Sequence, residues 1–154
     1  MSLESVKKHL DESNLGLVIM EMDGSTATVE LAAEAIGVEP GQIAKTMALK
    51  LGDKNVLIVS KGDAKIDNRK YKDCFKTKAK MLSGDEVLEI TGHPVGGVCP
   101  FGLKNPLEIY LDNSLKKYDY VYPAAGSKNS AVRITLEQLQ NITNGKWIDV
   151  CKQD

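Results

Sequence analysis

Short runs of apolar residues, separated by glycine, proline and polar residues, predict a series of strands. The run NVLIVS at 55–60 is typical of a buried strand, and the Gly52-Asp53 pair before it is a turn of the kind that closes a hairpin. The other strands that this pattern predicts span 15–22, 46–51, 107–111, 118–122, 131–134 and 146–150.

Helix-capping residues and the helical spacing of apolar residues predict short helices between these strands. Thr28 has the side chain of an N-cap and Gly37 is a typical helix stop, so a helix is expected over 29–36. The segments Ser83–Glu86 and Thr135–Gln138 have the S-x-x-E and T-x-x-Q forms of a capping box. Helices are therefore expected at 2–12, 29–36, 67–74, from 83 to near 92 and after 135, with a short turn or helix at 40–41.

Strands outnumber helices in this pattern, and several neighbouring strands are joined by short turns rather than by long crossovers. These features predict an α+β fold: a mixed, largely antiparallel sheet or barrel with flanking helices. No low-complexity linker, internal repeat or long charge block interrupts the chain, and 154 residues is the length of one ordinary domain. A single domain over residues 1–154 is therefore expected.

The composition, 42% hydrophobic and 27% charged, is that of a globular protein, which argues against disorder. No stretch approaches roughly 18 consecutive apolar residues, and the first ten residues lack the apolar core of a secretory signal. The protein is therefore expected to be cytoplasmic and to have no membrane partner. Its two histidines and its three cysteines, Cys74, Cys99 and Cys151, do not form the ligand clusters of a metal site, so no metal is expected.

Charge is unevenly distributed along the chain. The formal net charge is −1, yet the segment 61–80 contains eight lysines and arginines against three aspartates, a local charge of +5. A basic surface on an otherwise acidic protein can steer a polyanion without indiscriminate binding. The alternative is a solvated, lysine-rich surface with no ligand, which charge alone does not exclude.

The segment 92–102, GHPVGGVCPFG, is the most unusual in the sequence. Four glycines and two prolines in eleven residues suit neither a helix nor a strand interior. They predict a stiff loop whose exposed main-chain N–H groups can donate to a carbonyl oxygen or to a developing oxyanion. A purely structural turn between a helix and the next strand is the alternative. The loop matches neither common phosphate-binding glycine pattern, so no nucleotide cofactor is expected.

Five blocks of sequence follow one another over about residues 15–148. They are VELAAEAIG, V-x-P-x-Q-I-A-K-T, S-K-G-D-A-K-I-D, the loop GHPVGGVCPFG, and V-Y-P-A-A-G-S-K-N-S-A-V-R-I-T-L-E-Q-L. In this order they resemble the YbaK / prolyl-tRNA-synthetase-associated editing domain family. Any single block is weak evidence, and five in family order are specific.

The resemblance implies a mixed sheet or barrel with flanking helices, and hydrolysis of wrongly attached amino acids from tRNA without a metal or a side-chain nucleophile. The family's lysine falls on Lys45, and its glycine loop on Gly96 to Gly102, whose backbone positions the aminoacyl carbonyl. An aminoacyl ester is already an activated acyl group, so its hydrolysis needs positioning and oxyanion stabilisation more than a strong nucleophile. The site residues implied are Lys45, Gly96, Gly97 and Gly102 for catalysis, and His93, Val98, Cys99, Pro100 and Phe101 for contact with the substrate.

The partner implied by the resemblance is a mischarged tRNA, in a prolyl or similarly small amino-acid system. An aminoacyl-tRNA synthetase is a second candidate partner. The basic segment then supplies candidate phosphate contacts for the acceptor stem. These candidates are Lys61, Lys65, Arg69, Lys78 and Lys80.

Two departures from the family limit what carries over. Some members have an acidic residue in the region of Ala131, and some have an aromatic residue beside the pocket where this chain has Glu21-Met22-Asp23, so amino-acid specificity does not carry over. One alternative function is a tRNA- or synthetase-binding module that has the fold and no activity. Another is a thiol hydrolase with Cys99 as nucleophile and His93 beside it, for which no orienting third group is visible.

Overall fold

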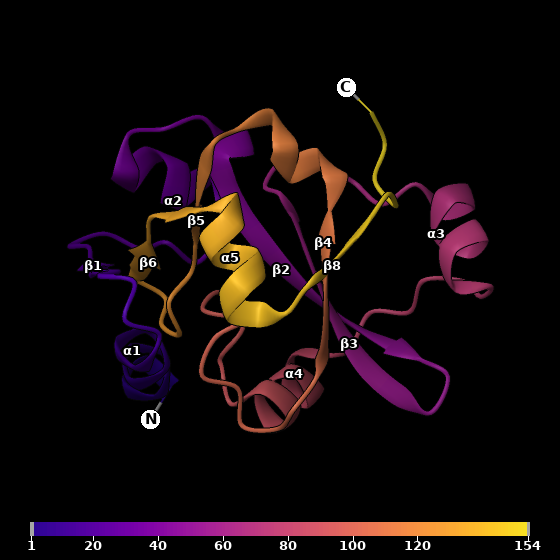
Figure 1. Ribbon diagram of the computed structural model, residues 1–154, viewed down its shortest axis with the longest axis horizontal. Helices are drawn as coiled ribbons and strands as arrows, with labels where there is room; N and C mark the ends of the chain where they lie inside the picture. The colour runs from indigo at the N-terminus through magenta and orange to yellow at the C-terminus, as the bar shows by residue number, and fades with distance from the viewer. Residues whose placement is uncertain (1, 154) are drawn as a thin grey trace.

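The structure, a computed structural model, describes residues 2–153 (Figure 1). The strands in those residues are β1 (Ile19–Glu21), β2 (Ile43–Leu51), β3 (Lys54–Lys61), β4 (Glu108–Asp112), β5 (Tyr120–Pro123), β6 (Ser130–Val132), β7 (Ile134–Thr135) and β8 (Lys146–Ile148). The α-helices are α1 (Ser2–Glu12), α2 (Val29–Ile36), α3 (Asn68–Phe75), α4 (Gly84–Thr91) and α5 (Leu136–Thr143), and two short 3-10 helices are η1 (Pro40–Gln42) and η2 (Asn113–Lys117).

Six strands form one curled sheet in the order β7-β5-β2-β3-β4-β8, and β1 pairs with β6 in a second, two-stranded sheet. The longest ladder is the antiparallel β2–β3 hairpin, closed by the predicted turn at Gly52-Asp53. The pairings of β5 with β2, β3 with β4 and β4 with β8 are parallel. The α+β class and the mixed sheet are therefore confirmed. The parallel pairs join strands that are distant in sequence, which turn signals do not reveal.

The strand expected at 131–134 is divided between the two sheets. Ser130–Val132 pair with β1, whereas Ile134–Thr135 pair with β5. Between them, the guanidinium of Arg133 lies 3.9 Å from the centre of the Tyr120 ring. The chain therefore changes sheets at one residue in the middle of an apolar run, and the run by itself does not mark that change.

The helix boundaries follow the capping residues of the sequence. The Thr28 hydroxyl accepts a hydrogen bond from the first turn of α2, and Gly37 ends that helix with a left-handed φ of 86°. The predicted capping boxes at Ser83–Glu86 and Thr135–Gln138 start α4 and α5. Each cap satisfies main-chain N–H groups that a helix start would leave unpaired. No helix in residues 2–153 is long and apolar enough to cross a membrane.

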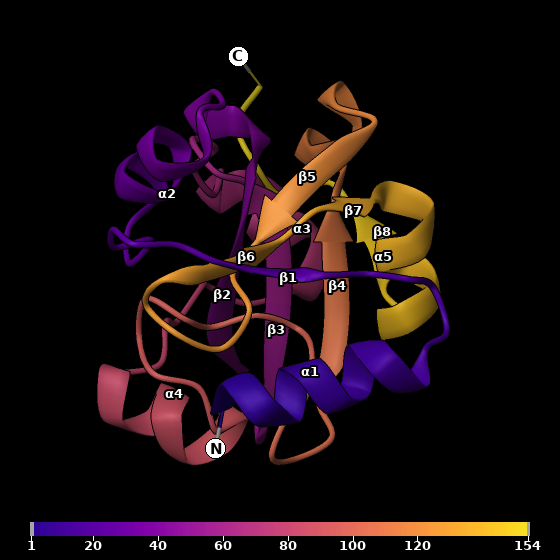
Figure 2. The ribbon, with the colours of Figure 1, turned by 90° about the vertical axis from the view of Figure 1, so that its left-hand side faces the viewer.

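The central strand β3 is buried on both faces. Leu57 and Val59 point into one core, against which α1 packs, and Figure 2 shows α1, β1 and β6 lying across this side of the sheet. Val56 and Ile58 point into a second core that includes Tyr71 of α3. This two-sided burial explains why residues 56–59 of β3 are all apolar rather than alternating with polar residues.

Candidate active site

A cavity of about 440 Å³ opens beside the outer edge of β2, the edge opposite β3. Its walls come from within five parts of the chain: 26–32, 43–48, 81–87, 95–98 and 122–131. Among the residues that the structure describes, Lys45 is the one charged residue in a lining that is mostly small and apolar. No group of three or more histidine, cysteine, aspartate or glutamate residues within 2–153 is placed to hold a metal ion.

Lys45 extends from β2 and is half-buried. Its Nζ donates a hydrogen bond to the main-chain oxygen of Ala64. Burial lowers the pKa of Lys45 from its ordinary value of 10.5, and the nearby Cys151, Asp63 and Glu30 oppose that effect. A cation that has lost part of its hydration interacts more strongly with negative charge on a ligand than a cation in bulk water does.

A tight turn after β3 brings the Ala64 oxygen to Lys45. A Cβ atom on Gly62 in this turn would lie 2.2 Å from the carbonyl oxygen of Pro40 and 2.8 Å from that of Ile43. Only glycine allows this approach. The S-K-G-D-A-K-I-D block of the sequence therefore forms part of the framework that holds the lysine.

Three residues of the predicted loop, Val95, Gly96 and Val98, line the cavity together with Lys45. Gly96 has a left-handed φ of 93°, and a Cβ atom there would lie 3.0 Å from the Cβ of Ala27, another residue of the lining. The backbone conformation and this close packing both favour glycine. The fold thus brings the predicted lysine and part of the predicted loop to one cavity, although they are far apart in sequence.

Gly97 and Gly102 lie outside the cavity lining and serve close packing within the fold. The Gly97 N–H donates to the carbonyl oxygen of Pro94 at 2.9 Å, and a Cβ atom on Gly97 would lie 2.7 Å from the main-chain nitrogen of Ser127. The Gly102 N–H donates to Nδ1 of His9 on α1 at 2.9 Å. Both of these N–H groups are occupied inside the chain, which leaves Gly96 as the member of the three glycines that borders the cavity.

His93, Cys99, Pro100 and Phe101 are buried and also lie outside the cavity lining. His93 Nε2 is 2.7 Å from the carbonyl oxygen of Phe101 and therefore carries the proton, because a carbonyl only accepts. Nδ1 accepts from the Ser2 hydroxyl, and burial lowers the pKa of the ring. Cys99 Sγ, 3.7 Å from Nε2, thus faces a donor rather than a base, and burial raises the pKa of the thiol to about 12. This pair is unsuited to thiolate chemistry.

One of the predicted tRNA contacts is not on the surface. Only 4% of the Lys61 side chain is exposed, and its Nζ lies 3.4 Å from Asp63 Oδ1. Lys61 is the last residue of β3 and pairs with Ala44 of β2, so the sheet buries a position that charge alone placed on a basic surface. Lys61 is therefore not a surface contact, contrary to the prediction. The remaining predicted contacts are all exposed: Lys65, Arg69, Lys78 and Lys80.

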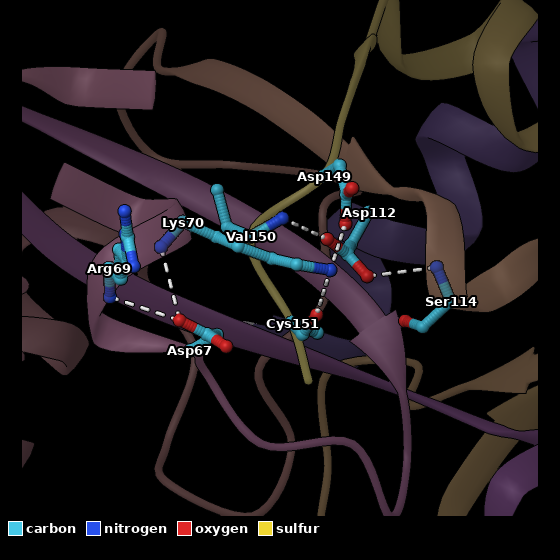
Figure 3. Close-up of polar contacts among 8 residues, drawn as sticks. All are labelled: Asp67, Arg69, Lys70, Asp112, Ser114, Asp149, Val150 and Cys151. Carbon is cyan, nitrogen blue, oxygen red and sulfur yellow. Dashed lines mark hydrogen bonds and ion pairs between the residues drawn. The ribbon is translucent and has the colours of Figure 1, made fainter. Parts of the chain in front are cut away.

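The basic segment also supplies part of a polar cluster that anchors the chain after β8 (Figure 3). Lys70 Nζ is 3.0 Å from Asp149 Oδ1 and 3.0 Å from the carbonyl oxygen of Cys151. The two carboxylate oxygens of Asp112 each accept from a main-chain N–H at 2.8 Å. The C-terminal polar cluster, as we call it, consists of Asp67, Lys70, Asp112, Ser114, Asp149 and the main chain of 150–151.

Sequence reasoning selected as site residues none of the hydroxyl-bearing residues of the cavity lining, which are Thr26, Thr28, Thr46, Tyr122 and Ser130. The Thr26 hydroxyl donates to the carbonyl oxygen of Ser130 at 3.4 Å, and the Ser130 hydroxyl is 2.6 Å from that of Ser127. Thr46 Oγ1, in contrast, is buried and has no hydrogen-bond partner in the described structure. The one signal in the sequence that could have indicated Thr46 as a site residue is its position directly after Lys45 in the I-A-K-T block.

Comparison with known proteins places this architecture in a family. A model of the aminoacyl-tRNA editing domain matches residues 23–142, and the chain belongs to that family. It is 52% identical over 154 residues to the uncharacterized protein YwhH of Bacillus subtilis, covering 99% of this chain and 98% of that protein. It is 28% identical over 130 residues to EbsC of Enterococcus faecalis, a candidate Cys-tRNA(Pro)/Cys-tRNA(Cys) deacylase, covering 82% and 79% of the two chains. The crystal structure of a candidate trans-editing enzyme for prolyl-tRNA synthetase matches with a TM-score of 0.90 at 31% identity, covering 99% and 98% of the chains.

The resemblance to the YbaK-type editing family is thereby confirmed, as is the fold class that it implied. Deacylation of tRNA is supported at the level of the family.

Proposed function

We propose that this protein hydrolyses the ester that joins a wrong amino acid to its tRNA. The observation that carries the proposal is the cavity itself, where Lys45, the one charged residue of the described lining, lies beside Gly96 in an otherwise mostly apolar wall. A small acyl group attached to a polyanion needs both features: apolar surface for the acyl side chain, and a positive charge near the ester or the terminal phosphate. Membership of the editing family supports the same class of reaction.

In the proposed reaction a water molecule attacks the carbonyl carbon of the ester, and the bond from that carbon to the ribose oxygen breaks. The amino acid leaves as a free carboxylate. Of the two protons of the attacking water, one goes to the ribose oxygen, which restores the terminal hydroxyl of the tRNA, and the other is released to solvent. Lys45 stabilises the negative charge that develops on the ester, and its partial burial strengthens that interaction. Gly96 packs closely against Ala27, so these two lining residues form one continuous wall against which the acyl group can be positioned, and positioning contributes to the rate as well.

The substrate we propose carries a small, uncharged amino acid, as in a prolyl or similar system. The cavity has no carboxylate in its described lining to pair with a basic side chain, and many of the residues that line it are small. The exposed residues Lys65, Arg69, Lys78 and Lys80 are proposed contacts for acceptor-stem phosphates. A prolyl-tRNA synthetase is a second proposed partner, because the structural relative is described as a candidate trans-editing enzyme for one.

The test is release of labelled amino acid from a panel of tRNAs that each carry one amino acid. We expect release from at least one mischarged tRNA and strong loss of that release in Lys45→Ala. Lys8→Ala is the matched control, since Lys8 is an exposed lysine on α1 outside the cavity. Binding of tRNA without release from any panel member would contradict hydrolysis and indicate a binding module of the same fold.

A further inference from the structure

The outer edge of β2 has a gap in its hydrogen bonding where it borders the cavity. β5 pairs with this edge only at Ile43 and Ala44. The next pairing on the same side is the bridge between Leu49 and Met81. Between Ala44 and Leu49 no strand within residues 2–153 pairs with this edge, and residues 43–48 line the cavity.

Thr46 directs its main-chain groups into this gap. In an antiparallel ladder, alternate residues turn their N–H and C=O groups to opposite edges of the strand. On the outer edge of β2, the Lys50 N–H donates to the Lys80 oxygen, and the Ala48 oxygen accepts from the Leu82 N–H. The even-numbered residues of β2 therefore face outward, and Thr46 is the next of them toward the cavity.

The side chain of Thr46 adds a third polar group at the same place. Thr46 Oγ1 is buried without a hydrogen-bond partner in the described structure, although buried polar groups in folded proteins are nearly always paired. Thr46 thus combines an N–H donor and a C=O acceptor on the edge that borders a mostly apolar cavity with a hydroxyl that has no partner in the described structure. Such a set fits a ligand that carries a donor and an acceptor close together.

We infer that the aminoacyl group of the substrate docks on Thr46 as one residue of an added strand. In a hydrogen-bonded antiparallel pair, two residues exchange both N–H···O=C bonds. An amino acid ester carries the same two groups, an α-ammonium donor and a carbonyl acceptor, and these complement the C=O and N–H of Thr46. The Thr46 hydroxyl oxygen accepts a further hydrogen bond from the ammonium.

The cavity lining indicates which groups can bind the ammonium. No carboxylate lines the cavity in the described structure, so the ammonium has to be held by uncharged acceptors. The same docking directs the ester carbonyl to the Thr46 N–H, beside Lys45 on the same strand. The inference rests on the proposed function and adds a substrate class: esters with a free α-amino group, in preference to esters without one.

The experiment uses the full chain and two substrates that differ in one group. One is the aminoacyl-tRNA that the panel shows to be cleaved fastest, and the other is the α-hydroxyacyl-tRNA with the same side chain. We expect wild-type protein to cleave the aminoacyl ester about 10- to 100-fold faster in single-turnover assays, the range set by hydrogen bonds to a charged group. Equal cleavage of both esters would overturn the inference and leave the proposed function intact. No cleavage of any aminoacyl-tRNA would overturn both.

Variants at two threonines separate recognition from structure. Thr46→Val removes the hydroxyl at constant shape, and we expect it to slow the aminoacyl ester by about 10-fold or more while the α-hydroxyacyl ester changes little. Its unfolding midpoint should not fall, because the lost hydroxyl has no partner within the fold. Thr46→Ser should retain most of the preference. Thr91→Val is the matched control, because Thr91 is buried outside the cavity lining and its hydroxyl donates to the carbonyl oxygen of Val87. Equal slowing of both esters by Thr46→Val would contradict binding of the ammonium.

Discussion

The cavity and the C-terminal polar cluster lie on the same sheet and differ in whether their buried polar groups have hydrogen-bond partners. In the cluster, both carboxylate oxygens of Asp112 accept main-chain hydrogen bonds, and Lys70 has two oxygen partners at 3.0 Å. In the cavity, Thr46 Oγ1 has no partner in the described structure, and the Lys45 ammonium donates a hydrogen bond to the carbonyl oxygen of Ala64. The cluster is complete without a ligand, and the cavity is not.

This difference separates stability from function. A buried polar group that is paired holds the fold together, and removing its partner leaves an unsatisfied group that costs stability. A polar group left unpaired in an apolar cavity costs stability in the free protein and becomes useful when a ligand supplies the partner. Variants in the cluster should therefore affect unfolding, and variants in the cavity should affect the rate.

Lys45→Ala is expected to have the largest effect. Loss of an electrostatic stabiliser of the reacting ester typically costs about 2.7–4 kcal/mol, or roughly a hundred- to thousandfold in rate. Lys45→Arg should not rescue fully, because the planar guanidinium is larger and differently directed. Single-turnover deacylation with the best panel substrate measures both, with Lys8→Ala as the control. If a folded Lys45→Ala protein deacylated the substrate at the wild-type rate, the reaction would not take place at the cavity that contains Lys45.

Asp112→Ala should show the opposite behaviour. Its carboxylate holds the N–H groups of Ser114 and Val150, and their loss should lower the free energy of unfolding by about 2–3 kcal/mol. The rate per folded molecule should stay at the wild-type value, because Asp112 does not line the cavity. Urea denaturation and single-turnover assays in the same buffer test both statements. A fall in rate with an unchanged free energy of unfolding would contradict a structural role for Asp112 and would indicate that the C-terminal polar cluster takes part in the reaction.

Neutralising the exposed part of the basic segment should weaken tRNA binding without changing the fold. Each lost phosphate contact should reduce the slope of log K against log[salt] by about 0.7–0.9. Binding titrations at several salt concentrations measure this slope. The variant replaces Lys65, Arg69, Lys78 and Lys80 by glutamine, and the control, with the same change in charge, replaces the exposed Lys7, Lys8, Lys104 and Lys146. An unchanged slope in the first variant would make the segment a solvated surface.

The contribution of Lys45 should also depend on pH. Burial lowers the pKa of Lys45 below its ordinary value of 10.5, so the cation that stabilises the ester is present at neutral pH and is lost as the pH rises through that lowered pKa. The ratio of the wild-type rate to the Lys45→Ala rate should therefore fall in the alkaline range, below pH 10.5. The spontaneous rate of ester hydrolysis, measured without protein, is subtracted from both rates before the ratio is taken, because an added background that rises with pH would by itself lower the ratio. A ratio that is constant with pH would contradict a role for the charge.

Cys99→Ala should have the smallest effect on the reaction. The thiol is fully buried, its pKa is raised to about 12, and it faces a histidine nitrogen that carries a proton. Activity should therefore be retained in single-turnover assays, with a modest loss of stability of about 1 kcal/mol from the buried volume removed. Complete loss of activity in a folded variant would support covalent thiol chemistry.

Local sequence signals predicted most of the elements because they depend on residues a few positions apart. The capping boxes that start α4 and α5 and the hairpin turn at Gly52-Asp53 lie where the sequence indicated. The lengths of strands were less predictable. The apolar run 15–22 supplies only the three-residue β1, because the ladder with β6 ends there, and the run 131–134 divides between two sheets. A partner strand decides where a ladder ends, and the partner is distant in sequence.

At the site, the sequence by itself indicated the glycine loop through its unusual composition, and it indicated Lys45 through the family order of the sequence blocks. Only the tertiary structure separated Gly96, which borders the cavity, from Gly97 and Gly102, whose N–H groups are bonded inside the chain. It also buried Lys61 and left Thr46 unpaired. The physical reason is the same in each case. Whether a polar group finds a partner depends on the segments packed against it, and those segments come from other parts of the chain.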